Sequence, residues 1–561
     1  MTRNYILKTQ NMFFYLKALL LVSFFVLSYH GITARISNIG LSPGLLVFIF
    51  VWILSILTIL ILAYNRNNVI KLAWILVITI LTILGRTYYD ITATYLGFFD
   101  FERILDAYAY TDQAISFYTN NLVNVIAITL LLAVGMLIPP YYKNINIKSK
   151  TVFLLPFLPI LITSGIVYSK SGEGSNGLPD YNNILAYSFI YTIENITRPD
   201  NVLRAPVNIS VKQNKIENVI LVMDESIHGA FLDLNNKKNG ARTGLPKEHL
   251  VNFGLATSAS NCSTASNLSV RFGASKNNHL HDILTHPSLW SYAKNAHYTT
   301  TYIDGQRTNG NLMNQMTTEE LSDVDNFLQL DEQTKPYNKD IKIAHLVRKL
   351  LKENKSNFIY INKMGAHFPY EGKYPKSGAL YKPTMIQTYF GNESDPKVNK
   401  ARTNTREKKL RVINSYKNAV SWNTRQFFKV LLEKLDLKNT AIIYTSDHGQ
   451  DFNEEDKSGN RTHCSTYNAP ADEGIVPFVF ITDNDVLLPE LKAARKINFN
   501  NVSHFNLYPT ILELFGYSAA DITRSGHMEP SIFMKLPDGN REFMSLFFTR
   551  FGRKPLWVQI D

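Results

Sequence analysis

Hydroxyl side chains crowd around one cysteine in the stretch SASNCSTASNLSVRFGAS, residues 258–275. Four of them surround Cys262: Ser260, Ser263, Thr264 and Ser266. An isolated serine or threonine hydroxyl is a weak nucleophile near neutral pH, and it needs a general base or a metal ion to activate it. The same stretch could instead begin a helix, with Ser263 or Thr264 as its N-cap. The two interpretations are compatible, because a helix N-terminus also favours a bound phosphate.

Carboxylate and imidazole side chains that could complete such a site occur further along the sequence. Glu225, His367 and the adjacent Asp447 and His448 each follow a short apolar run, and His463 comes a little later. Any one of them alone would more often be a solvated or hydrogen-bonded side chain. Together they offer the oxygen and imidazole ligands that Zn²⁺ or Mn²⁺ accepts. A dication beside Thr264 would activate its hydroxyl and offset the charge of a transferring phosphoryl group.

The elements that position these residues follow from the apolar pattern. Five runs are typical of buried strands: 218–223, 299–303, 357–362, 440–446 and 476–482. Between them, the stretches 342–354 and 411–436 repeat apolar residues at helical spacing. This alternation predicts an α/β sandwich with a largely parallel central sheet. Chemistry in such folds gathers beyond the carboxyl ends of the strands, where the candidate residues are expected to lie.

The N-terminal part of the chain differs sharply from the rest. Five apolar blocks there are long enough to span a bilayer: 12–32, 44–64, 69–85, 122–138 and 152–168. The first block is long and lacks a small-residue cleavage pattern, so a cleaved signal peptide fits poorly. We predict a transmembrane domain of five helices at 1–170, a linker and membrane-proximal segment at 171–215, and a catalytic domain at 216–561. A chain of 561 residues is also long enough for two domains.

Charges in the predicted loops indicate the orientation. Basic residues concentrate before the first block, after the second and after the fourth, and this side is expected to be cytoplasmic. Five spans then place the second half of the chain outside, in the periplasm of a bacterium. Both cysteines, Cys262 and Cys464, fall in that exported half, where a disulfide could persist, although the sequence leaves their pairing open. The net charge of +12 suits an anionic lipid surface or a solvated basic exterior.

Four motifs in this order resemble one family. NVILVMDES, NCSTASNLSV, NKMGAHFPYEGKYP and the stretch from TSDHGQDFNEE to THCSTY are similar to the membrane-anchored phosphoethanolamine transferases of the alkaline phosphatase and sulfatase superfamily. The resemblance implies a sulfatase-like (alkaline phosphatase-type) catalytic domain. It also implies a zinc ion bound by four residues, Glu225, Thr264, Asp447 and His448, with Thr264 as the nucleophile. His367 and His463 would contact the phosphoryl group, a second zinc or the leaving group.

The resemblance further implies a double displacement. Phosphatidylethanolamine is the expected donor, diacylglycerol leaves, and a phosphoethanolamine-threonine intermediate passes the group to lipid A or to the lipopolysaccharide core. His367 or His463 would protonate the leaving alkoxide. We expect a monomeric, multi-pass protein of the bacterial inner membrane that contacts membrane lipid and binds no nucleic acid.

Departures from the family pattern leave the substrates open. Asp224 stands where the family usually has glycine, which makes it a candidate further ligand, and Gln450 replaces a glutamate. Cys262 alone remains of the usual cysteines near the nucleophile. Arg307, in the loop after the second predicted strand, is a candidate partner for a phosphate.

Three other functions are alternatives to a phosphoethanolamine transferase. A sulfatase requires a proline and an arginine after its modified cysteine or serine, and CSTAS has neither. Phosphoglycerol transferases that resemble lipoteichoic acid synthase also combine five spans with a threonine nucleophile, and they stay open. So does a catalytically silent protein that keeps the fold, for which no bound metal is expected.

Overall fold

The computed structural model describes two compact units of the chain. The first is formed by Met1–Pro199, and the second by Asp200–Ile386, Arg402–Thr549 and Lys554–Asp561. The residues described are 2–65, 67–92, 94–106, 111–139, 148–197, 204–353, 355–385, 406–452, 462–527, 529–546 and 555–560.

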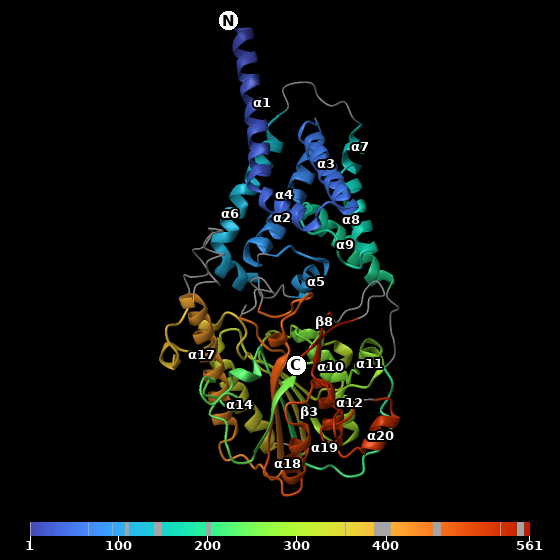
Figure 1. Cartoon of the computed structure of the whole chain (residues 1–561), viewed down its shortest axis with the longest axis vertical. Helices are drawn as coiled ribbons and strands as arrows, with labels where there is room; N and C mark the ends of the chain where they lie inside the picture. Colours follow the sequence, from blue (N-terminus) through green and yellow to red (C-terminus); the bar gives the residue numbers. More distant parts are fainter. Residues whose placement is uncertain are drawn as a thin grey trace. The chain divides into compact units, whose positions relative to one another are not determined.

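The first unit is helical (Figure 1). Its helices are α1 (Thr2–Leu27), α2 (Tyr29–Ile39), α3 (Pro43–Ala63), α4 (Asn68–Thr92), α5 (Phe98–Asp106), α6 (Thr111–Leu137), α7 (Ser149–Leu154), α8 (Phe157–Ser169) and α9 (Asp180–Thr197). Among the described residues, three segments are long and apolar enough to cross a membrane: Pro43–Ala63, Asn68–Thr92 and Ser149–Ser169. The other two predicted spans coincide with shorter apolar stretches, Met12–Leu27 and Asn121–Leu137. All five predicted blocks are therefore helical, and within the described residues three of them are both long and apolar enough to span a membrane.

A buried lysine of one helix forms hydrogen bonds with the ends of two others. Lys17 of α1 is 1% exposed. Its Nζ donates to the carbonyl oxygens of Ala63 at 2.8 Å, Met136 at 3.3 Å and Ile138 at 2.9 Å. These carbonyls lie at the C-terminal ends of α3 and α6, where a helix has unpaired acceptors and favours a cation. The ammonium thus satisfies groups that the apolar surroundings could not.

Helix α9 falls inside the range predicted as a linker. It packs against α8 and α4, and five of its apolar residues are buried: Tyr181, Ile184, Ala186, Tyr187 and Ile190. Asn182 donates a buried hydrogen bond of 2.8 Å to Ser55 of α3. Residues 180–197 therefore belong to the first unit rather than connecting the two units.

The second unit is built on a seven-stranded sheet of order β2-β7-β6-β1-β5-β3-β4. Its strands are β1 (Asn218–Asp224), β2 (Leu250–Thr257), β3 (Thr299–Asp304), β4 (Asn326–Gln329), β5 (Asn357–Asn362), β6 (Thr440–Ser446) and β7 (Ile475–Ile481). Neighbouring strands from β6 through β1, β5 and β3 to β4 are parallel, and β7 is antiparallel to both β6 and β2. The five predicted strands and the largely parallel sheet are confirmed, whereas β2 and β4 were not predicted.

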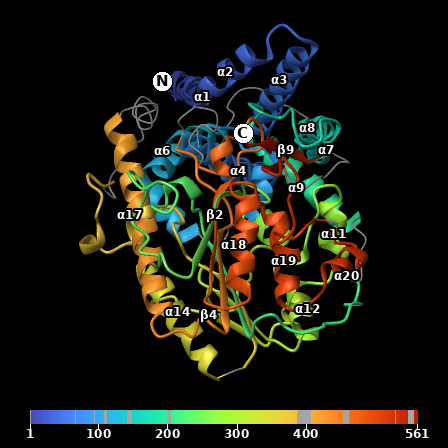
Figure 2. The ribbon, with the colours of Figure 1, turned by 60° about the horizontal axis from the view of Figure 1, so that its bottom comes forward.

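Helices cover both faces of this sheet. They are α10 (Ser263–Phe272), α11 (His279–Thr285), α12 (Leu289–Asn295), α13 (Thr318–Leu321), α14 (Pro336–Glu353), α17 (Arg406–Leu431), α18 (Leu487–Asn498), α19 (Leu507–Leu514) and α20 (Ala519–Arg524). Figures 1 and 2 show α14 and α17 together on one flank and α12, α19 and α20 on the other. A small antiparallel pair, β8 (Glu542–Leu546) and β9 (Leu556–Gln559), completes the unit.

The main core lies between the sheet and α12, α18 and α19. Alternate residues of β1, such as Leu221 and Met223, pack there with Trp290 of α12 and Leu512 of α19. Because β2 is antiparallel to β7, which is antiparallel to β6, the end of β2 lies at the same edge as the ends of β1 and β6. The loops that follow β1, β2, β3, β5 and β6 therefore meet at one edge of the sheet.

Candidate active site

Three of the predicted ligands converge where β1 and β6 end. The two strands are parallel neighbours with Asp224 paired to Ser446, so the residues that follow them leave the sheet side by side. Glu225, Asp447 and His448 are all buried, and their ligand atoms lie within 4.8 Å of one another. The distance from His448 Nε2 to Glu225 Oε1 is 3.5 Å, and to Asp447 Oδ2 it is 3.7 Å.

Hydrogen bonds aim these side chains at a common point. Asp447 Oδ1 accepts from the backbone N–H groups of Ser226 at 3.0 Å and His448 at 2.8 Å. His448 Nδ1 donates to the carbonyl oxygen of Gly449 at 2.7 Å, which turns Nε2 toward the carboxylates of Glu225 and Asp447. Asp447 Oδ2 and His448 Nε2 are buried atoms without a hydrogen-bond partner in the described part of the chain. Two unsatisfied buried ligand atoms beside a carboxylate fit a divalent cation.

Glu225 is held from two sides. Its Oε1 accepts from the Ser226 hydroxyl at 2.7 Å, and its Oε2 accepts from Gln306 Nε2 at 2.9 Å. Gln306 was not predicted; it comes from the loop after β3, and its position just beyond a strand end was the available signal. Arg307 follows it as a largely buried side chain, so the loop proposed to contact a phosphate does reach the cluster through its neighbour.

The buried charges of Glu225, Asp447 and His448 shift one another's pKa values. Burial and the neighbouring charge of Glu225 raise the pKa of Asp447 to about 8. Burial disfavours a charged His448, but the adjacent Asp447 and Glu225 raise the pKa of its imidazole to about 9. Burial also opposes ionisation of Glu225, yet the neighbouring imidazole of His448 holds the pKa of this carboxyl well below its usual value. Two carboxylates in one buried site thus draw positive charge toward themselves.

His367 reaches this edge through a tight turn after β5. Gly365 has a φ of +50°, and a Cβ there would lie 2.3 Å from Asp224 Oδ1, so only glycine lets the loop pass. The next residue, Ala366, donates its N–H to the carbonyl oxygen of Glu225 at 3.0 Å. His367 Nδ1 donates to the carbonyl oxygen of Phe368 at 2.6 Å, and burial lowers the pKa of this imidazole. His367 is therefore a neutral base beside the cluster.

His463 stacks on a residue of the cluster, and a disulfide joins its segment to the helix that carries Thr264. The ring of His463 stacks on that of His448, with 4.2 Å between centroids and 17° between planes. The next residue, Cys464, forms a disulfide with Cys262, and their Cα atoms are 4.9 Å apart. Cys262 is the N-cap of α10, which carries Thr264 in its first turn. The pairing that the sequence left open thus joins the segment of His463 to the helix of Thr264.

Helix α10 contacts β5 through a side chain on the face that also carries Thr264. Asn267 accepts a hydrogen bond of 2.7 Å from the hydroxyl of Tyr360 on β5. Thr264 lies three residues earlier on the helix and so shares this face. It is half-buried, and in the described part of the chain its hydroxyl makes no hydrogen bond. A helix does begin in this stretch, but its N-cap is Cys262 rather than the predicted Ser263 or Thr264.

Asp224 turns away from the three ligands. Its Oδ2 forms an ion pair of 2.6 Å with Lys363 Nζ, in which both side chains are fully buried, and accepts a hydrogen bond of 3.0 Å from Tyr444. Its Oδ1 accepts from the N–H of Glu225 at 3.0 Å. Lys363 therefore supplies the positive charge that a metal would otherwise provide, and the role of Asp224 is to fix the backbone of Glu225.

Replacing Lys363 with methionine should destabilise the protein by about 3–5 kcal/mol, because it leaves a buried carboxylate without its partner. The apparent Tm of the purified chain in detergent measures the loss. The double variant Asp224→Asn/Lys363→Met should recover part of it, since Asp224 is then neutral while Asp340, 3.5 Å from Lys363 Nζ, still loses its partner. An unchanged Tm in Lys363→Met would contradict this account of Asp224.

Removing the disulfide should also be costly. The double variant Cys262→Ser/Cys464→Ser opens a link between residues 202 positions apart, and a cross-link of this kind stabilises by about 2–5 kcal/mol. We expect a lower Tm for the variant, and an equal fall for the unaltered chain after reduction. Reductant should not change the Tm of the double variant. Two free thiols in the unaltered, unreduced chain would contradict the pairing.

Comparison with known proteins assigns the second unit to a class. The sulfatase family model matches residues 217–517, more than half of the chain and nearly all of the seven-stranded sheet unit. The chain belongs to the sulfatase family.

Individual relatives are more distant. The chain is 27% identical over 205 residues to the Kdo(2)-lipid A phosphoethanolamine 7''-transferase of Salmonella typhimurium. It is 26% identical over 207 residues to the protein of the same name from Escherichia coli (strain K12). The alignments cover 35% of this chain and 31% of each relative, so the chain matches about a third of their length.

One solved structure matches both units. The integral membrane protein lipooligosaccharide phosphoethanolamine transferase A from Neisseria meningitidis superposes with a TM-score of 0.61 and 15% identity. The match covers 90% of this chain and 95% of that protein. The two proteins share a fold in which a helical membrane unit precedes a sulfatase-type unit.

Proposed function

We propose that this protein transfers phosphoethanolamine from phosphatidylethanolamine to lipid A or the lipopolysaccharide core through a phosphothreonine intermediate at Thr264. The observation that carries the proposal is the convergence of Glu225 with the unsatisfied Asp447 Oδ2 and His448 Nε2 at the strand ends. The names of the two curated relatives support a lipid A acceptor. The fold shared with the Neisseria protein supports the combination of membrane and catalytic units.

The proposed metal is Zn²⁺, with Mn²⁺ as the alternative. Glu225, Thr264, Asp447 and His448 would hold it, since carboxylate, hydroxyl and neutral imidazole groups suit either ion. When bound, the ion would lower the pKa of a neighbouring hydroxyl and offset the charge of the phosphoryl group. The repulsion between the two buried carboxylates, which contributes to the raised pKa of Asp447, is consistent with such an occupant.

The residues of the chain carry the proposed transfer. In the first half, Thr264 Oγ1 bonds to phosphorus while the bond from phosphorus to the diacylglycerol oxygen breaks. The threonine proton passes to a histidine, which returns it to the leaving oxygen; His367, as a neutral base, and His463, stacked on His448, are the two groups proposed for this role. In the second half, an acceptor oxygen bonds to phosphorus, the Thr264–phosphorus bond breaks, and the proton of the acceptor restores the threonine hydroxyl.

The proposed location is the bacterial inner membrane, with several spans and the catalytic unit in the periplasm. Apolar helices of the first unit and the distribution of basic residues support this orientation. The Cys262–Cys464 disulfide supports an oxidising compartment for the catalytic unit. The protein is proposed to act as a monomer.

Mass spectrometry of lipid A and core oligosaccharide tests the proposal in cells with and without the gene. We expect a species heavier by one phosphoethanolamine group only where the gene is active. A phosphoglycerol increment instead would identify the alternative transferase, and no increment on any glycolipid would indicate a silent protein. Cells that express Lys237→Ala, an exposed change in the second unit, serve as the control for expression.

A further inference from the structure

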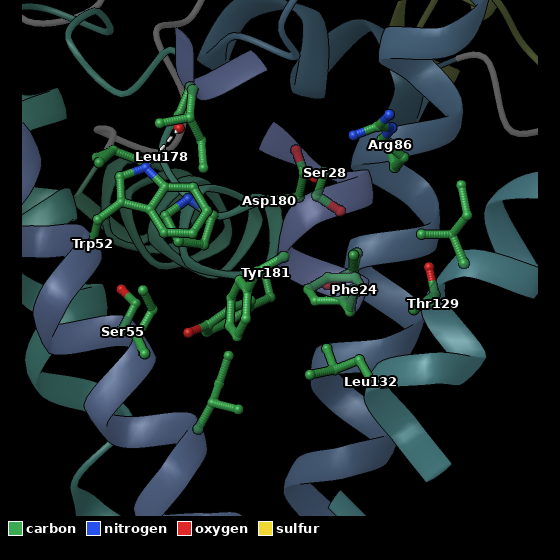
Figure 3. Close-up of a pocket in the computed structure, with 18 of the residues that line it drawn as sticks. Phe24, Ser28, Trp52, Ser55, Arg86, Thr129, Leu132, Leu178, Asp180 and Tyr181 are labelled. Atoms are coloured by element: carbon green, nitrogen blue, oxygen red, sulfur yellow. Dashed lines mark hydrogen bonds between the residues drawn. The ribbon is translucent and has the colours of Figure 1, made fainter. Parts of the chain in front are cut away.

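A second site lies inside the helical unit. A cavity of about 80 Å³ is lined by α1, α3, α4 and α6 together with the segment 177–181 (Figure 3). One water molecule requires only about 10–15 Å³ by the same measure, so the space holds a group of several atoms. Most of its wall is aliphatic or aromatic, with Phe24, Ile59 and Leu132 among the lining residues. Charged groups in such surroundings are expensive and usually mark a binding site.

One charged group in the wall is the carboxylate of Asp180. Asp180, the first residue of α9, lines the cavity and makes no hydrogen bond or ion pair within the described residues. It packs on Gly85 of α4, where an added Cβ would lie 2.6 Å from the Cβ of Asp180. Burial raises the pKa of Asp180 to about 7, Arg86 acts in the opposite direction, and Asp90 reinforces the rise. A cationic group of a ligand would stabilise the charged form of this carboxylate.

The other charged group is a guanidinium that is only partly engaged. Arg86 Nε donates to Asp90 Oδ1 at 3.2 Å, and the Arg86 side chain keeps 20% of its exposure. Its two terminal nitrogens make no hydrogen bond in the described part of the chain and remain available to an anion. Figure 3 shows Arg86 reaching from α4 toward the end of the cavity where Asp180 and Ser28 lie. Cationic and anionic groups thus occupy one end of a largely apolar space.

We propose that this cavity binds the head group of a phospholipid with a primary amine, its ammonium at Asp180 and its phosphate at Arg86. The apolar walls between membrane helices accommodate the start of the acyl chains. A primary ammonium donates hydrogen bonds to a carboxylate, which a trimethylated amine cannot, so the site distinguishes the two head groups. The inference rests on the proposed function only in identifying the bound lipid as the phosphoethanolamine donor.

Lipid retention by the full-length chain in detergent tests the site by native mass spectrometry. Phosphatidylethanolamine, phosphatidylcholine and phosphatidylglycerol are added in turn at equal concentration. We expect phosphatidylethanolamine to be retained in preference to the other two. Asp180→Asn and Arg86→Met should each weaken retention about tenfold or more, as loss of a charge-assisted hydrogen bond implies. Arg86→Lys should keep part of the binding.

Matched controls come from the same unit. Asp100 and Arg103 of α5 form an ion pair of 3.1 Å outside the cavity, so Asp100→Asn and Arg103→Met should retain the lipid as the unaltered chain does. An unaltered Tm in Asp180→Asn separates lost binding from lost folding. Thr264→Ala should bind phosphatidylethanolamine normally even though transfer fails, which separates this site from the proposed reaction. Equal retention by Asp180→Asn and the unaltered chain, or equal retention of phosphatidylglycerol, would overturn the proposal.

Discussion

Replacing Thr264 with alanine should reduce phosphoethanolamine transfer by about a thousandfold or more, because no covalent intermediate can form without the attacking oxygen. The fold should be unaffected, since Thr264 is half-buried and its hydroxyl makes no hydrogen bond in the described part of the chain. Transfer is measured with purified enzyme in detergent, from a labelled phosphatidylethanolamine to lipid A. The Tm of the variant should match that of the unaltered chain.

The neighbouring hydroxyl provides the control for this variant. Ser263→Ala removes the same kind of group one residue earlier on α10 and should keep most of the activity. Thr264→Ser retains a hydroxyl and should keep a measurable fraction. Full activity in Thr264→Ala, or an equal loss in Ser263→Ala, would refute Thr264 as the nucleophile.

Changing His448 to alanine should lower the metal content of the purified protein at least about tenfold, and Asp447→Asn should do the same. Each variant removes one of the two buried ligand atoms that have no partner in the described residues. Elemental analysis by mass spectrometry after dialysis gives the amount of zinc and manganese per chain. Transfer should fall together with the metal.

His228→Ala is the matched control for the metal variants. His228 also follows β1 and is buried, but its Nε2 pairs with Asp472 at 3.1 Å and lies outside the cluster of ligands. Its loss should leave the metal content unchanged. A full complement of metal in His448→Ala would show that the three side chains do not form the binding site.

Much of the second unit could be predicted from sequence because its strands are short apolar runs with clear ends. Residues that directly follow neighbouring parallel strands must share one edge, so Glu225, Asp447 and His448 were expected to meet. The strand β2 was not predicted, since its sequence LVNFGLAT mixes polar and small residues with apolar ones. Its contribution is nonetheless important, because it delivers the loop that leads to Thr264.

Other features of the site depend on contacts that spacing does not encode. The pairing of Cys262 with Cys464 joins segments that are 202 residues apart. Lys363 neutralises Asp224 from the position that follows β5, and Gln306 reaches Glu225 from the loop after β3. No local pattern specifies such partners, which follow only from the order of strands in the sheet.

In the membrane unit, too, some features could be predicted from the sequence and others could not. Its apolar blocks could be located from composition, including 69–85, which continues as α4 to Thr92. The cavity around Asp180 and Arg86 could not be predicted, because it depends on α9 packing back onto α4.

The most direct test of the central claim is peptide mass spectrometry of the protein after exposure to phosphatidylethanolamine without an acceptor. We predict that the peptide containing Thr264 gains one phosphoethanolamine group, that fragmentation places it on the threonine, and that added lipid A removes it. A turnover-competent enzyme whose modification lies on another residue, or that never becomes modified, would contradict the account.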